Sequence, residues 1–261
     1  MGTPRALTLV LFLLAVCLVP AQGSTVEQYG YRVLERLPQS RQHFVQGLQI
    51  LDGQLYVSTG NYGQSKLLRY SFPEGELDVI RKLHPRIFAE GVTVLDDKVY
   101  QLTWQNRRML VYGREQLTPS HSFPLPGEGW GITTNGEQLI YSDGSDKLHF
   151  MSPLTGRIER SLSVTESGQP LAKLNELEWV DGRLWANIWQ SDRVVIIDPA
   201  SGAVTGSIDL QGLLPEEERQ PGTDVLNGIA RNPADGAIWV TGKRWPWIYR
   251  IEVLPKGSQL P

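Results

Sequence analysis

The sequence has a single cysteine, Cys17, among its 261 residues, and this cysteine lies in an apolar stretch near the N-terminus. If that stretch is removed from the mature chain, no thiol remains, which excludes disulfides, cysteine nucleophiles and cysteine metal sites. The sequence also lacks an excess of positive charge, because 25 Lys and Arg stand against 28 Asp and Glu, for a formal net charge of −3. Domains that bind nucleic acids carry a basic face. We therefore expect no nucleic-acid partner.

Hydrophobic runs long enough to cross a membrane are missing as well. The longest run, residues 6–19, is shorter than the roughly 20 residues that a membrane-spanning helix needs. Arg5 precedes this run and small residues follow it at Ala21 and Gly23, which is the pattern of a secretory signal peptide. We predict a signal peptide over residues 1–23, cleaved after Ala21 or Gly23, and a secreted or periplasmic protein that does not stay in the membrane.

The motifs of several common enzyme classes are also absent. There is no Gly-x-Ser-x-Gly elbow of a serine hydrolase, no His-Glu-x-x-His zinc motif and no pair of histidines at ligand spacing. No glycine-rich loop joins a strand to a helix, so a nucleotide site is not expected. The sequence therefore predicts neither a metal nor a cofactor.

One pattern occurs five times along the chain. Each copy begins with a lead residue, continues through a small and an apolar residue to a turn such as Asp52-Gly53, and ends in a strand that contains aromatic residues. The lead residues are Gln46, Glu90, Trp130, Asn175 and Asn227. They are 40 to 52 residues apart, and such a period with a hairpin signal in each unit is typical of a β-propeller. We predict an all-β, five-bladed β-propeller that forms one catalytic domain over residues 24–261.

A second set of positions lies eight residues after the turn of each copy. These residues are Gly60, Trp104, Gly144, Trp189 and Lys243. Equivalent positions of successive blades lie around the axis of a propeller. The small and apolar neighbours of the lead residues repeat, whereas the two sets themselves diverge into an acid, amides, indoles and an amine. This divergence indicates a repeated scaffold with a functional site at one end.

Short β-runs separated by turns dominate the rest of the pattern. They include residues 66–70, 109–112, 147–150 and 194–198. We expect an N-terminal strand at residues 31–37 to complete the last blade, which would close the ring without an exposed edge. The one helix we expect covers residues 214–218, where a proline and three acids occupy the first turn.

Glu90 is the sharpest candidate for chemistry. It follows the apolar residues 87–89 and precedes Gly91. A carboxyl group in such surroundings has a raised pKa, which suits it to transfer protons. Taken alone, a glutamate at a strand start is more often solvent-facing or salt-bridged, but its place among the lead residues favours the catalytic interpretation.

Lys243 and the two asparagines have comparable alternatives. Lys243 is either a surface lysine that lies over the indoles of Trp245 and Trp247, or a fixed positive charge that stabilises an oxyanion. Asn175 and Asn227 are either turn residues or groups that hold a substrate amide or carboxyl.

The tryptophans of the two sets are either core residues or walls of a pocket. Trp104, Trp130 and Trp189 each lie beside a loop, and an indole at such a place commonly forms the wall of a binding site. Their positions favour pocket walls.

Several motifs, in this order, are similar to those of the glutaminyl-peptide cyclotransferases of the plant and bacterial type. The matching segments are Phe44-Val45-Gln46-Gly47-Leu48, Phe88-Ala89-Glu90-Gly91, Gly129-Trp130-Gly131, Leu174-Asn175-Glu176, Asn187-Ile188-Trp189-Gln190-Ser191-Asp192 and Thr241-Gly242-Lys243-Arg244-Trp245-Pro246. Val45 departs from the threonine of that family. The resemblance covers nearly all of the mature chain.

This resemblance implies a five-bladed propeller that converts the N-terminal glutamine of peptides or proteins to pyroglutamate, with release of ammonia and without a metal. It implies Glu90 as the catalytic acid and base, and Asn175 and Lys243 as polar partners of the reacting amide. The implied walls and contacts of the substrate pocket are Phe44, Gln46, Phe88, Trp104, Trp130 and Trp189. Asn227 is added to them on its position in the repeat. No feature of the sequence indicates a dimer interface, so we expect a monomer.

Two other functions remain open on the residues alone. A non-catalytic propeller could bind peptides or sugars through its aromatic mouth, although such a site needs neither a buried acid nor a buried amine. A metal-dependent hydrolase or lactonase needs several acids and amides around one cation. The lead residues offer one acid, Glu90, and place Lys243 beside it, which argues against a central cation.

Overall fold

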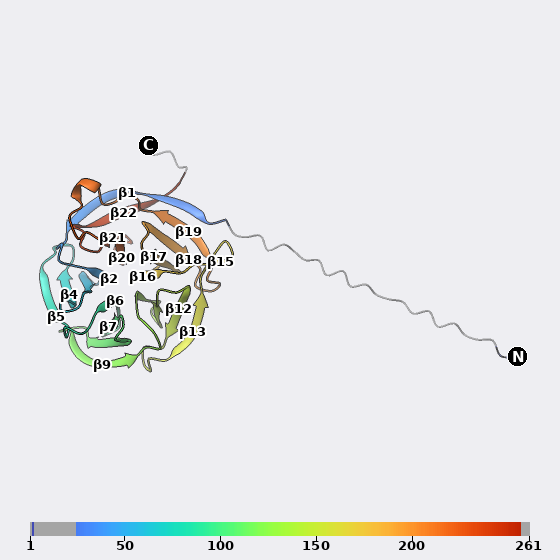
Figure 1. Cartoon of the computed structure of the whole chain (residues 1–261), viewed down its shortest axis with the longest axis horizontal. Coiled ribbons are helices and arrows are strands. Elements are labelled where there is room, and N and C mark those ends of the chain that lie inside the picture. Colours follow the sequence, from blue (N-terminus) through green and yellow to red (C-terminus); the bar gives the residue numbers. More distant parts are fainter. Residues whose placement is uncertain (1, 3–24, 257–261) are drawn as a thin grey trace.

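The structure, a computed structural model, describes residues 2 and 25–256. The predicted signal peptide, including both candidate cleavage sites, lies outside the described residues except for Gly2. The described chain is almost entirely β, so the expected all-β class is confirmed. The sheets stand around a centre in Figure 1, with β2, β6, β16 and β20 near the middle and β5, β9 and β13 at the rim. No helix of the described residues is long and apolar enough to cross a membrane.

Three sheets are four-stranded antiparallel meanders in which the chain runs from the centre outward. The first contains β2 (Val45–Leu51), β3 (Gln54–Thr59), β4 (Lys66–Ser71) and β5 (Leu77–Lys82). The second contains β6 (Ala89–Leu95), β7 (Lys98–Thr103), β8 (Arg108–Gly113) and β9 (Thr118–Pro124). The third contains β10 (Ile132–Thr134), β11 (Leu139–Ser142), β12 (Lys147–Met151) and β13 (Ile158–Ser163), and a small hairpin of β14 (Thr165–Glu166) and β15 (Gln169–Pro170) follows it.

The remaining strands form one eight-stranded sheet. Its order is β16 (Leu174–Val180), β17 (Arg183–Ile188), β18 (Arg193–Ile197), β19 (Val204–Asp209), β1 (Glu27–Pro38), β22 (Trp247–Pro255), β21 (Ile238–Gly242) and β20 (Leu226–Arg231). Strand β1 pairs in parallel with β19 and antiparallel with β22. The strand expected at residues 31–37 is thus confirmed, and it is longer than expected because it also reaches β19. By covering both outer edges, β1 removes two exposed strand edges from the ring (Figure 1).

Burial along each meander explains why these residues form strands. All seven residues of β6 are buried, as expected for a strand at the centre of the ring, whereas most residues of β9 at the rim are exposed. Apolar side chains fill the space between adjacent sheets. One such cluster joins the first sheet to the last, and in it the ring of Phe72 packs edge-on against Trp239 at 5.2 Å. The ring is therefore closed by core packing as well as by β1.

The five inner strands pack backbone to backbone around the centre. Strands β2, β6, β10, β16 and β20 contact one another in cyclic order. Four of the five lead residues are followed by glycine, and the closeness of the strands explains this choice. A Cβ atom at Gly47 would lie 2.4 Å from the Val92 nitrogen, and one at Gly131 would lie 2.0 Å from the Asn175 carbonyl oxygen. Contacts this short leave no room for a side chain.

Four of the lead residues lie at irregularities in strand pairing. In these copies, the pairing register between the inner strand and its neighbouring strand shifts at the lead residue, which is Gln46, Glu90, Asn175 or Asn227. A β-bulge redirects the side chain of its extra residue. The repeat of the lead position is therefore, in four copies, a repeat of bulges at one end of the inner strands. Trp130 lies two residues before β10.

The centre of the ring contains two buried acids. The carboxylate of Glu176 accepts hydrogen bonds from the backbone N–H groups of Leu48 (3.3 Å) and Ile229 (2.8 Å), and that of Glu178 accepts one from Arg231 N (2.8 Å). Burial raises the pKa of Glu176 well above its ordinary value and that of Glu178 to about 8, although the hydrogen bonds oppose the change. The two side chains thus supply hydrogen-bond acceptors for backbone N–H groups at the inner edges of β2 and β20.

The short helix expected at residues 214–218 is present over only part of that range and is not an α-helix. The structure has a single 3-10 turn, η1 (Glu216–Glu218), with Pro215 as its N-cap and no side-chain cap. Glu218 is held by Arg36 and by the indole N–H of Trp247, so contacts with the neighbouring strands fix this segment rather than helix propensity.

Replacing Gly131 with alanine tests the close packing at the centre. We expect Gly131→Ala to destabilise the protein by about 1–3 kcal/mol or more, because neither the Asn175 carbonyl nor its strand can move away without disturbing the ring. Chemical denaturation followed by circular dichroism measures the change. Gly113→Ala is the matched control, since its nearest neighbour would be 4.0 Å away. Equal stability of the two variants would contradict the packing argument.

Stability should fall as the pH rises through the range in which Glu178 loses its proton. Its pKa is raised on folding, so its contribution is complete below the ordinary glutamate value and is lost as the pH approaches about 8. We expect Glu178→Gln, which keeps an acceptor but cannot ionise, to reduce the loss of unfolding free energy between pH 5 and 9, by an amount on the order of 1–3 kcal/mol. An unchanged pH profile of unfolding would show that Glu178 does not titrate in this range.

Candidate active site

A cavity of about 360 Å³ lies at the end of the inner strands where the bulges occur. Its walls combine five aromatic rings with polar side chains. The lining residues are Phe44, Gln46, Asn61, Phe88, Glu90, Trp104, Trp130, Asn175, Trp189, Gln190, Asp224, Val225 and Lys243. Nine of the ten residues predicted from the sequence are therefore brought together in one place.

The tenth, Asn227, does not line the cavity. Its side chain is fully buried, and its amide group donates to the Val45 carbonyl (3.1 Å) and to Oε1 of Gln46 (3.3 Å). The bulge at Asn227 therefore directs its side chain toward β2 rather than into the cavity. Asn227 holds Gln46, and with Oε1 of Gln46 occupied, the NH₂ group of Gln46 remains as a donor.

Glu90 and Lys243 are buried in the cavity wall, with 5 % and 4 % of their surface exposed. Among the described residues, no hydrogen bond or ion pair within 4.0 Å involves the Glu90 carboxyl or the Lys243 ammonium. The ammonium instead lies over the ring of Phe44, 4.9 Å from its centroid. Both groups are thus held in position but lack the partner that a buried charge normally has.

The electrostatics of the pair are set by burial. Burial raises the pKa of Glu90 well above its usual range; the positive charge of Lys243 opposes this shift, and the carboxylate of Glu128 adds to it. Burial also lowers the pKa of Lys243, against the effect of Glu90 and Asp224. Burial thus favours the neutral form of each group.

Asn175 provides a further polar group without a protein partner. It lies at the bulge of β16, and its Oδ1 atom is buried with no hydrogen bond. Its backbone carbonyl accepts a hydrogen bond from the hydroxyl of Ser142 (2.7 Å), which fixes the backbone. The side chain is therefore left to bind a molecule in the cavity.

Glycines of the second repeated set leave room for the aromatic walls. A Cβ atom at Gly60 would lie 2.5 Å from the ring of Phe88, and one at Gly144 would lie 2.6 Å from the ring of Trp130. The rings also support one another, since Phe88 packs edge-on against Trp104, and Trp130 against Trp189, each pair at 5.5 Å. The two glycines of this set thus leave room for aromatic residues of the cavity wall.

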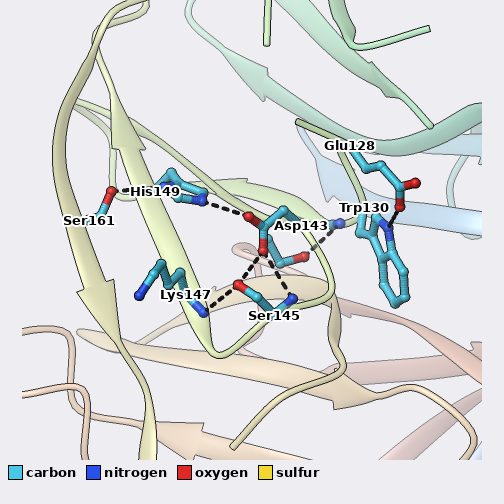
Figure 2. Close-up of polar contacts among 9 residues, drawn as sticks. Glu128, Trp130, Asp143, Ser145, Lys147, His149 and Ser161 are labelled. Carbon is cyan, nitrogen blue, oxygen red and sulfur yellow. Dashed lines mark hydrogen bonds and ion pairs between the residues drawn. The ribbon is translucent and has the colours of Figure 1, made fainter. Parts of the chain in front are cut away.

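Glu128, which the sequence analysis missed, connects two of these walls. Its Oε2 atom accepts hydrogen bonds from the indole N–H groups of Trp104 (2.7 Å) and Trp130 (3.0 Å), and Figure 2 shows the second of these. One carboxylate thus orients two indoles and places a negative charge near Glu90. Its position between Gly127 and Gly129, two residues before a predicted wall, was a signal that could have identified it.

A second polar network supports the loop that carries Gly144. In Figure 2, Asp143 is bound by Nε2 of His149 (3.0 Å), and Nδ1 of the same ring contacts the hydroxyl of Ser161 (2.9 Å). Although burial opposes it, the hydrogen bonds from His149 and Ser145 lower the pKa of Asp143 to about 2. This network fixes the β11–β12 loop against Trp130.

The cavity contains a second acid that the repeat did not indicate. Asp224 lies in the loop before β20, and its backbone N–H donates to the Lys243 carbonyl (3.0 Å), while Lys243 N donates to Val225 O (2.9 Å). These two hydrogen bonds fix the backbone of Lys243 to the loop before β20. Glu90 is still the one acid among the lead residues, and Asp224 reaches the cavity from outside the repeat. In the part of the chain that the structure describes, no group of three or more His, Cys, Asp or Glu side chains is arranged to hold a metal.

The ring of sheets and the buried acid–amine pair define a propeller-like protein with a site for proton-transfer chemistry. The family model of glutamine cyclotransferases matches residues 7–253, so the chain belongs to that family. It is 34% identical over 227 residues to a glutaminyl-peptide cyclotransferase of Arabidopsis thaliana, covering 85% of this chain and 70% of the relative. These findings confirm the prediction of an enzyme with glutaminyl-peptide cyclotransferase activity, which is an acyl transfer, over a purely binding propeller.

Solved structures agree with this assignment. Glutaminyl cyclase of Myxococcus xanthus has a TM-score of 0.82 and 31% identity, covering 88% of this chain and 99% of that one. The WD40 β-propeller domain of Doa1 has a TM-score of 0.51 at 12% identity, covering 80% of this chain and 63% of that one. The second likeness concerns the fold alone.

Removing the charge of Glu128 should change the ionisation of Glu90. We expect Glu128→Gln to lower the pKa of Glu90, because the carboxylate that raises it is lost while an acceptor for an indole N–H remains. The ¹³C chemical shift of the Glu90 carboxyl, followed as a function of pH, measures this directly. Glu137→Gln, which removes an exposed acid elsewhere, is the control. A Glu90 titration that is the same in both variants would contradict the proposed interaction.

Proposed function

We propose that this cavity cyclises the N-terminal glutamine of peptides or proteins to pyroglutamate, with Glu90 as general acid and base. The observation that carries the proposal is that a buried carboxyl and a buried ammonium face one aromatic cavity without protein partners. Leaving both unpaired is unfavourable for folding. A substrate that forms hydrogen bonds with both groups, and exchanges a proton with one of them, would explain why both are kept in the cavity.

The aromatic walls orient the glutamine side chain. Trp104 and Trp130, fixed by Glu128, and Phe88 offer flat apolar surfaces for the methylene groups and the amide plane. The reaction is intramolecular, so the enzyme gains most by holding the rotamer in which the α-amine approaches the γ-carbonyl carbon. The NH₂ group of Gln46, turned toward the cavity by Asn227, is a donor for the substrate backbone.

Proton transfer is assigned to Glu90. The α-amine attacks the γ-carbonyl carbon and forms the C–N bond of the lactam, while Glu90 accepts the proton that the amine loses. Glu90 then returns this proton to the γ-NH₂ group as the old C–N bond breaks, and ammonia leaves. A pKa raised by burial suits both halves of this exchange.

The developing negative oxygen is assigned to Lys243 and Asn175. The ammonium of Lys243, held over Phe44, supplies a fixed positive charge, and the Asn175 amide supplies a hydrogen-bond donor. The unpartnered Oδ1 of Asn175 is also an acceptor for the departing NH₂ group. No step in this scheme needs a metal or a cofactor.

We also infer a five-bladed propeller in one domain over residues 24–261. Three meanders give three blades, and the eight-stranded sheet is interpreted as two blades that β1 joins. Five lead residues and five inner strands in cyclic contact support this count. The signal pattern supports a secreted or periplasmic protein, and we propose that it acts as a monomer.

Replacing Glu90 with glutamine is the direct test. We expect Glu90→Gln to lower kcat for ammonia release from a short Gln-initiated peptide by about 10²–10⁴-fold, the usual contribution of a general acid and base. Lys243→Gln should lower it by about 10²–10³-fold, as for loss of one oxyanion donor. The assay couples ammonia release to a dehydrogenase and is repeated with a chelator present.

The control is Glu115→Gln, an exposed acid on the β8–β9 turn, with circular dichroism to check that each variant folds. Turnover retained in folded Glu90→Gln would remove Glu90 from the mechanism. Activity lost to the chelator in the unmodified enzyme would show that the scheme omits a metal.

A further inference from the structure

A second hollow, of about 680 Å³, is lined in part by Arg244, the residue that follows Lys243 of the active-site cavity. Its walls carry four cationic residues, Arg41, Lys66, Lys82 and Arg244, and no acidic residue. The other lining residues are neutral. We call this hollow the basic groove.

The positive charges of the basic groove are not neutralised by the protein. Among the ion pairs of the described residues, none involves any of the four. Lys66 and Lys82 are direct register partners on β4 and β5, although like charges directly opposite one another are unfavourable. Arg41 donates from one nitrogen to the Glu218 carbonyl (2.8 Å), but its buried Nη1 has no partner. An anion bound in the groove would pair with these cations, reduce the repulsion between Lys66 and Lys82, and accept a hydrogen bond from Nη1 of Arg41.

Two segments of the chain line both the groove and the active-site cavity. Phe44 lies between them, with the Lys243 ammonium 4.9 Å and the Arg244 guanidinium carbon 5.7 Å from its ring centroid. Asn61 lines the cavity and residues 63–65 of the same turn line the groove. The charged groups of Lys243 and Arg244 are therefore no farther apart than the sum of these two distances, which is the length of about three residues of extended chain.

Arg244 is held in a fixed and unusual conformation. Its φ of 61° lies in the left-handed region, which is unfavourable for residues other than glycine. A hydrogen bond from Arg244 N to the His43 carbonyl (2.7 Å) keeps it there. The backbone thus turns sharply between Lys243 and Arg244, so that successive residues serve the cavity and the groove.

We propose that the basic groove binds acidic side chains at the positions just after the N-terminal glutamine, so that the enzyme prefers Gln-initiated substrates with an acidic start. This inference rests on the proposed function, since it assumes that the glutamine occupies the cavity. Carboxylates two to four residues downstream would pair with cations that now have no partner. Basic residues at the same positions would be repelled.

The test compares kcat/KM for three peptides of equal length: Gln-Ala-Glu-Glu-Ala, Gln-Ala-Gln-Gln-Ala and Gln-Ala-Lys-Lys-Ala. We expect the acidic peptide to exceed the basic one on the order of tenfold, about two- to fivefold for each exposed contact. The difference should shrink strongly near 1 M salt, where the screening length is about 3 Å. The double variant Lys66→Gln/Lys82→Gln should reduce the preference, while Lys98→Gln/Lys147→Gln, which removes two lysines from other sheets, should keep it.

The outcomes separate the two proposals. Equal kcat/KM for the three peptides, or a preference that neither salt nor the Lys66/Lys82 variant reduces, would overturn the role of the groove while leaving the cyclisation proposal intact. Absence of ammonia release from all three peptides, including the neutral one, would overturn the proposed function itself. A salt-sensitive acidic preference that falls in the groove variant alone supports the inference.

Discussion

The close approach of the inner strands at the centre of the ring is the constraint on which the rest of the structure depends. Backbone meets backbone there, and four of the five copies have glycine after the lead residue. The remaining copy has Glu176 at that position, and its carboxylate reaches the N–H groups of β2 and β20. The space between the inner strands is thus filled by backbone atoms at the glycines and by the buried side chain of Glu176 on β16. Neither filling tolerates a change of size.

The same constraint creates the active site. Strands packed this closely cannot continue in regular pairing to their ends, and the register shifts occur at the lead residues. Three of the four side chains at these shifts, Gln46, Glu90 and Asn175, line the cavity, whereas Asn227 supports Gln46 from behind. A position that repeats for reasons of packing therefore carries different chemistry in each copy.

The sequence predicted the parts of the site that follow the repeat. Glu90 and Lys243 could be placed together because each belongs to a set of positions that recurs in every copy. Asp224 could not, because a loop outside the repeat brings it to the cavity. Glu128 also lies outside the repeat, and only its place between two glycines, two residues before Trp130, pointed to it. Asn227 was placed by phase alone, and the direction of its side chain depends on a neighbour 181 residues away in sequence. The helix expected at residues 214–218 is shorter than predicted for a related reason, since contacts of Glu218 with Arg36 and Trp247 fix this segment.

Burial alone does not distinguish the proposed catalytic acid, Glu90, from the other buried acids. Glu90, Glu176 and Glu178 are all buried, and burial raises the pKa of each. The difference lies in their hydrogen bonds: the carboxylates of Glu176 and Glu178 are occupied by backbone N–H groups, while that of Glu90 has no protein partner. A satisfied buried acid stabilises the fold, and an unsatisfied one is unfavourable unless another molecule completes it. Among three similar glutamates, the one that the scaffold does not use is therefore the one available for the substrate.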